Sequence, residues 1–115
     1  MSSAWREHAA YRRGLALYRA GHAWEAHEAW EDAWRVTPPG RERELLQGLI
    51  QLAAAVVQAR RGRARGARSV LARARGHLAR AAPVTCGLDV AALLDRLRGW
   101  EPAADPPDLG QLRDG

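Results

Sequence analysis

The residues that could do chemistry are concentrated in one short segment, residues 25–34 (EAHEAWEDAW). At 100° per residue, His27, Trp30 and Trp34 fall on one arc of a helix, and Glu31 and Trp24 lie at its edge. The small residues Ala23, Ala26 and Ala33 share this arc, which marks it as a packing surface. An imidazole and a carboxylate that point inward are costly to desolvate unless each meets a partner. The segment therefore predicts a polar site within an apolar surface.

Residues 41–61 supply the expected partners of this site. Gln47 and Gln51 belong to a narrow polar stripe on an otherwise apolar helix. If the two helices pack along these stripes, the two glutamines meet His27 and Glu31, which are themselves i and i+4 neighbours. Glu28 and Arg35 lie at the margin of the arc, where they could form an ion pair with each other or with a neighbouring helix.

Three interpretations of this constellation stay open. The first is a satisfied polar network that fixes helix register without any ligand. The second is a binding site for a small anionic ligand or a protein partner, with candidate residues His27, Glu28, Glu31, Trp34, Arg35, Gln47 and Gln51. The third is an enzyme in which His27 acts with Glu28 or Glu31 as general acid and base.

A metal site is the weakest interpretation. His27 and Glu31 are the candidate ligands, but the pattern His-Glu-x-x-Glu lacks the second imidazole of the zinc protease pattern His-Glu-x-x-His. No further ligand follows at a suitable spacing. We therefore expect neither a metal ion nor another cofactor.

Five helices are predicted to position these residues, over residues 4–20, 22–36, 41–61, 64–82 and 89–99. Ser3 and Asp89 are candidate caps of the first and last helices, and His22 of the second. The third helix is apolar around most of its circumference and should be the central one. His8 and His77 are expected on helix surfaces. No segment is predicted to be a strand.

Spacing favours a compact bundle built from two helical hairpins. The chain contains a weak internal repeat with an offset of 41 residues, in which Gly62, Ala67, Leu71 and Ala74 correspond to Gly21, Ala26, Trp30 and Ala33. The first hairpin also carries tetratricopeptide-like spacing, from Gly14 to Pro38. We predict one all-α domain over residues 1–100, followed by a flexible tail rich in Pro, Asp and Gly over residues 101–115.

Charge is distributed unevenly along this basic chain. Its net charge is +5, all 18 basic residues are arginine, and residues 45–88 contain eight arginines and no acid. Arg61, Arg65, Arg68 and Arg75 form a stripe that could meet nucleic-acid phosphates. Nucleic acid is the less favoured partner, because no aromatic residue interleaves with these arginines to stack on bases.

The remaining composition fits a small cytoplasmic protein. No apolar run is long enough to span a membrane, and the N-terminus lacks the features of a signal peptide. The single cysteine, Cys86, has no Cys or His at ligand spacing and is interpreted as a bystander. Five tryptophans in a chain without Phe point to core positions, and the tryptophan-rich second helix could complete its burial in a homodimer.

Three ordered motifs carry a family resemblance. They are GHAWEAHEAWEDAWR (residues 21–35), QGLIQLAAA (residues 47–55) and the glycines Gly62 and Gly66. In this order they resemble the small bacterial and archaeal family called domain of unknown function 309. The resemblance spans about residues 11–98 and implies an all-helical domain whose activity is not established. Members often carry a histidine where this chain has Val57 and Gln58, so a possible metal ligand is missing here.

Overall fold

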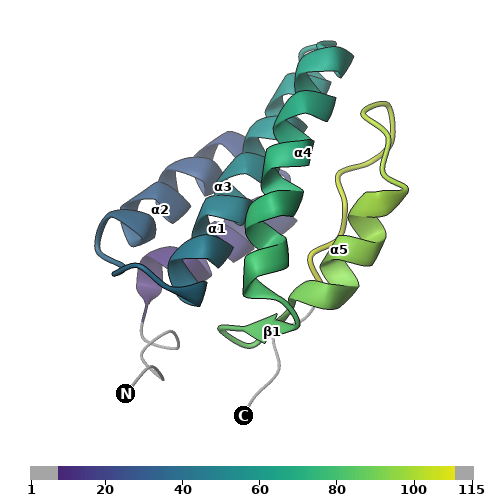
Figure 1. Ribbon diagram of the computed structural model, residues 1–115. Coiled ribbons are helices and arrows are strands. Elements are labelled where there is room, and N and C mark those ends of the chain that lie inside the picture. Colours follow the sequence, from purple (N-terminus) through teal and green to yellow (C-terminus); the bar gives the residue numbers. More distant parts are fainter. Residues whose placement is uncertain (1–7, 111–115) are drawn as a thin grey trace.

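The computed structural model describes residues 8–110, and every described helix is one that the sequence predicts. The helices are α1 (Ala9–Arg19), α2 (Ala23–Arg35), α3 (Arg41–Arg60), α4 (Ala64–Ala81) and α5 (Val90–Arg98), as Figure 1 shows. Apart from the start of α1, each helix begins and ends close to its expected boundaries. Ser3 and residues 4–7, the expected start of the first helix, lie outside the described residues.

The bundle is built from two antiparallel hairpins, as the internal repeat predicts. In the first, α1 packs on α2, and in the second α3 packs on α4, while α3 also packs on α2 (Figure 1). Gly21 (φ +88°) and Gly62 (φ +75°) make the two turns with a left-handed backbone that other residues rarely adopt. The predicted cap at His22 is wrong, because its side chain makes no capping hydrogen bond.

One short strand pair corrects the expectation that the chain has no strands. Strand β1 (Val84–Thr85) pairs antiparallel with β2 (Leu88–Asp89). Cys86 (φ +53°) and Gly87 (φ +75°) form the turn, and two successive positive φ angles are typical of a tight hairpin. The predicted cap at Asp89 is confirmed, since its Oδ1 accepts a hydrogen bond of 3.0 Å from the Ala92 amide.

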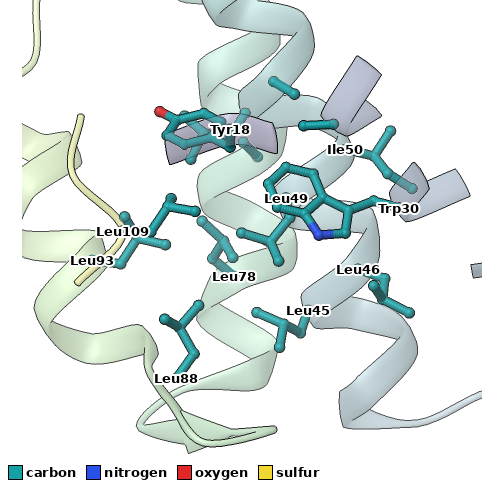
Figure 2. Close-up of a cluster of buried hydrophobic side chains, with 14 of the residues drawn as sticks. Tyr18, Trp30, Leu45, Leu46, Leu49, Ile50, Leu78, Leu88, Leu93 and Leu109 are labelled. Atoms are coloured by element: carbon teal, nitrogen blue, oxygen red, sulfur yellow. The ribbon is translucent and has the colours of Figure 1, made fainter. Parts of the chain in front are cut away.

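The hydrophobic core lies between the two hairpins and is closed by α5. Figure 2 shows Trp30 against Leu49 and Ile50, with Leu78 and Leu93 in the same cluster. Helix α3 contributes nine buried residues, more than any other described helix, which confirms that it is the central one. The structure is therefore an all-α bundle around one core.

Glycine allows the helices of each hairpin to approach closely. A Cβ atom on Gly14 of α1 would lie 2.3 Å from Nε1 of Trp30, and one on Gly48 of α3 would lie 2.6 Å from Cδ2 of Leu78. These distances are too short for real Cβ contacts, so the two large side chains occupy the space that the glycines leave.

Residues 101–110 pack against the bundle rather than extending from it. Leu109 is 1% exposed and belongs to the core, and the Tyr18 hydroxyl donates a hydrogen bond of 2.8 Å to the carbonyl of Pro107. The Arg19 guanidinium also donates to the carbonyl of Gly110. These contacts hold residues 107–110 on the bundle, within the segment that the composition predicts to be a flexible tail. Residues 111–115 lie outside the described part.

No helix within residues 8–110 is long and apolar enough to cross a membrane.

Candidate functional site

Helix α2 positions the candidate residues along one edge of its buried face. Its buried residues are Ala23, Ala26, Ala29, Trp30 and Ala33. His27, Glu31 and Trp34 follow the margin of this face and are half-buried, whereas Glu28 and Arg35 are exposed. The predicted arc is therefore correct, but the ionisable groups lie at its edge rather than at its centre.

His27 is held between Trp24 and Glu31. Its side chain is 17% exposed, and its ring stacks on the Trp24 indole with centroids 5.1 Å apart and planes 7° apart. Nδ1 lies 3.6 Å from Oε1 of Glu31, which is longer than a hydrogen bond. Among the described residues, this Nδ1 is the one buried side-chain nitrogen or oxygen without a hydrogen-bond partner.

The predicted hydrogen bonds from α3 to this histidine are not formed. Gln47 and Gln51 are half-buried on α3, but within residues 8–110 neither amide makes a hydrogen bond to His27 or Glu31. The polar stripe faces outward, because it lies on the side of α3 opposite the buried Leu45, Leu49 and Leu52. The satisfied network considered from the sequence is therefore absent from the described residues.

The charged residues at the margin of α2 form other pairs than expected. Arg35 pairs with Asp32 on its own helix at 2.9 Å, and Asp32 also lies 3.7 Å from Arg13 of α1. Glu28 has no ion pair with any described residue, so the predicted pair between Glu28 and Arg35 is wrong.

Trp34 is in contact with an arginine that sequence reasoning missed. The guanidinium carbon of Arg43 lies 4.0 Å from the centroid of the Trp34 ring, a cation–π contact between α2 and α3. Arg43 also donates a hydrogen bond of 2.9 Å to the carbonyl of Thr37. Because Trp34 and Arg43 lie on either side of the loop, only the hairpin geometry brings them together.

Helix α4 contributes a second histidine–carboxylate pair. His77 Nδ1 lies 2.8 Å from Oε1 of Glu44 on α3, and Arg80 lies 3.4 Å from the same oxygen. The hydrogen bond to His77 and the nearby Arg80 charge hold the pKa of Glu44 below its ordinary value. His77 is therefore bonded and half-buried, not solvated at the helix surface as expected.

Acid should weaken the fold partly through Glu44. Its folded-state pKa lies below the ordinary value of 4.5, so its stabilising contribution is present above pH 4.5 and is lost as the pH falls through the folded-state pKa. When the pH is lowered from neutral to below 4.5, we expect Glu44→Gln to lose less unfolding free energy than the unaltered protein. Urea denaturation at the two pH values measures this.

Glu25→Gln is the matched control for this pH measurement. Glu25 is exposed and has no ion pair with a described residue, so its removal should leave the acid sensitivity as in the unaltered protein. If both variants lose equally less unfolding free energy on acidification than the unaltered protein, the Glu44–His77 pair does not have this role.

Cys86 and the metal candidates offer little reactive chemistry. Burial raises the pKa of the Cys86 thiol to about 12, so it stays protonated at neutral pH and is a poor nucleophile. Among residues 8–110, no three His, Cys, Asp or Glu side chains come together in a group that could hold a metal ion. His27 and Glu31 therefore have no third potential metal ligand beside them among these residues.

The predicted arginine stripe is exposed along α4 and the turn before it. Arg61, Arg65, Arg68 and Arg75 all face solvent, although Arg68 pairs with Glu101 at 3.2 Å. A shallow hollow between α4 and α5 lies beside Arg75 and Arg98 and is otherwise lined by Ala72, Gly76, Ala79 and Leu94. Nucleic-acid binding by this surface stays a prediction.

Comparison with known proteins identifies the family of this chain. The model of the family described as "Domain of unknown function (DUF309)" matches residues 11–70. No curated protein and no solved structure matches the chain. The matched range contains the α2 site, the α3 stripe and both hairpin glycines, and it confirms the resemblance carried by the three motifs. Because the match covers more than half of the chain, the protein belongs to the DUF309 family.

Proposed function

We propose that this protein is a protein-binding module and that the exposed edge of α2 holds a cationic side chain of its partner. The observation that carries the proposal is Trp24, which is 52% exposed and has one face of its indole covered by His27. A large aromatic ring that is fixed in place and open to solvent is typical of the anchor residues of protein interfaces.

Charge at this edge favours a cation over an anion. Glu28 lies one turn from Trp24, and Glu31 lies one turn further along the same side of α2. Glu28 has no ion pair with a described residue, and Glu31 has only the 3.6 Å contact to His27. A lysine or arginine placed here would meet both carboxylates and the open face of the indole. The small anionic ligand considered from the sequence would meet repulsion instead.

The exposed indole favours a protein partner. Large aromatic side chains such as Trp24, which is 52% exposed, are enriched in protein interfaces. The acid–base alternative, with His27 and Glu28 or Glu31 as the reacting groups, rests on the 3.6 Å contact alone.

A basic peptide tests this proposal directly. We expect an amidated tri-arginine peptide to bind and a tri-glutamate peptide not to bind, as measured by calorimetry. Trp24→Ala should weaken tri-arginine binding about 5- to 30-fold, which corresponds to the roughly 1–2 kcal/mol of a partly desolvated cation–π contact. Glu28→Gln should also weaken it, because the carboxylate is lost.

Glu25→Gln is the matched control for the peptide experiment, since it removes the same charge from the same helix on the side away from His27. It should bind like the unaltered protein. If Trp24→Ala binds tri-arginine as tightly as the unaltered protein, or if both glutamate variants lose affinity equally, the α2 edge is not the binding site.

A further inference from the structure

Helices α2, α3 and α4 form one continuous face, with α3 in the middle. Arg43 of α3 touches Trp34 on the α2 side, and Glu44 of α3 bonds His77 on the α4 side. Between these contacts runs the outward stripe of α3, whose polar members are Gln47, Gln51 and Gln58. We call this surface the α2–α3–α4 face, and Figure 1 shows α3 between the other two helices.

The two edges of the α2–α3–α4 face carry opposite charges. The α2 edge presents the carboxylates of Glu28 and Glu31, whereas α4 contains no acidic residue. On the α4 edge, Arg73 is exposed and has no ion pair with a described residue. Arg80, two turns further on, is already paired with Glu44. Arg73 is thus a free cation at the height of Glu31, whereas Arg63, also exposed and without an ion pair to a described residue, lies at the far end of this edge.

The charges on the two edges lie at the same height along α3. Trp34 and His77 mark one level, because both contact the first turn of α3. Glu31 precedes Trp34 by three residues and Arg73 precedes His77 by four, so both lie about one helical turn from that level. Trp24, about three turns from Trp34, falls level with the stretch between Gly66 and Val70 of α4.

We propose that the partner of this site is a second copy of the chain, docked face to face about a two-fold axis parallel to α3. Such an axis places α2 of each copy over α4 of the other. Arg73 of one copy then lies beside Glu28 and Glu31 of its partner, and symmetry forms this contact twice. The inference rests on the proposed function, because Arg73 is the cationic side chain that the two carboxylates of the α2 edge hold, while Trp24 packs on α4. Since the dimer occupies this edge, tri-arginine binding is measured on the monomeric Arg73→Glu variant.

The same arrangement accounts for the groups that have no partner in the single chain. Trp24 would lie on the half-buried Val70 and on the Gln58 side chain, whose Oε1 would lie 3.5 Å from a Cβ atom on Gly66. The glutamines of the two α3 stripes would face each other across the axis. Since a side-chain amide both donates and accepts, Gln47 and Gln51 can bond their own copies.

Sedimentation velocity with charge-reversed variants tests the dimer. At micromolar concentration we expect the unaltered protein to sediment as a dimer of the 12.6 kDa chain. Arg73→Glu and Glu28→Arg should each weaken dimerisation at least about tenfold, because each places like charges in contact. Circular dichroism of the variants checks that both remain folded, as expected for two exposed positions.

Mixing the two variants provides the decisive result. In a mixed dimer, the arginine introduced at position 28 of one chain faces the glutamate introduced at position 73 of the other. The native Glu28 and Arg73 face each other in the second, symmetry-related contact, so both contacts are attractive again and the mixture should sediment as a dimer. Arg75→Glu is the matched control, because Arg75 is also exposed but lies on the opposite side of α4. It should remain dimeric.

Each contrary outcome has a distinct meaning. If the unaltered protein is a monomer that still binds tri-arginine through Trp24, the dimer is refuted and the proposed function stands. If it is a dimer that Arg73→Glu and Glu28→Arg leave intact, or if Arg75→Glu disrupts it equally, the docking geometry is wrong. If neither dimerisation nor peptide binding occurs, both proposals fail.

Discussion

Replacing Trp30 by alanine should lower the free energy of unfolding by about 3–5 kcal/mol, the range for removing a large buried aromatic side chain. Trp30 is 0% exposed and packs against α1 and α3 from its place on α2 (Figure 2). Its Nε1 donates a hydrogen bond of 3.1 Å to the carbonyl of Tyr11, and its ring lies 6.0 Å from that of Tyr18. Urea denaturation followed by circular dichroism measures the loss.

Trp24→Ala is the matched control, because it makes the same chemical change in the same helix. Trp24 is 52% exposed in the single chain, so in the monomeric Arg73→Glu background its removal should change the free energy of unfolding by less than about 1 kcal/mol. If the two variants lose equal stability, then Trp30 is not the central packing residue of the first hairpin.

Gly14→Ala should be nearly as damaging, although it adds only one methyl group. The added Cβ would lie 2.3 Å, 2.5 Å and 2.7 Å from three atoms of the Trp30 indole. The indole cannot easily move away, because it is fully buried and hydrogen-bonded to α1. Overpacking of this kind lowers the free energy of unfolding by about 1–3 kcal/mol, and we expect the upper end of that range.

Two further variants isolate this clash. Gly76→Ala is the control, since nothing lies within 4 Å of its added Cβ, and alanine should stabilise this helix by about 0.5–1 kcal/mol. In a Trp30→Ala background, Gly14→Ala should be much less harmful than in the unaltered protein, because the atoms it collides with are gone. Additive losses would show that Gly14 is needed for another reason.

Much of the fold is predictable because the helix ends are marked by residues with strong backbone preferences. Gly21 and Gly62 end two helices in a left-handed conformation, and Asp89 caps the last one. The edge of α2 is predictable too, since helical periodicity alone places His27 beside Trp34. The strand pair is not, because two residues per strand are too few to show an alternating pattern.

The surroundings of the candidate site depend on how neighbouring helices are rotated, which a helical wheel does not give. Periodicity finds the Gln47–Gln51 stripe on α3 but cannot tell whether it faces α2 or solvent. The Glu44–His77 bond joins residues 33 positions apart, so it depends on the register of α3 against α4. The contact between Arg43 and Trp34 is unpredictable for a similar reason, as it depends on the path of the loop.

Closure of the bundle by residues 101–110 has a consequence for synthesis of the protein on the ribosome. The hydrogen bond from Tyr18 to the Pro107 carbonyl joins residues 89 positions apart, and Leu109 is among the last described residues to be made. The two hairpins can form as they emerge, because their contacts are local. The pocket that receives Leu109 stays open to water until residues 101–110 have left the ribosome, so a nascent chain stalled before that point would expose apolar surface to chaperones.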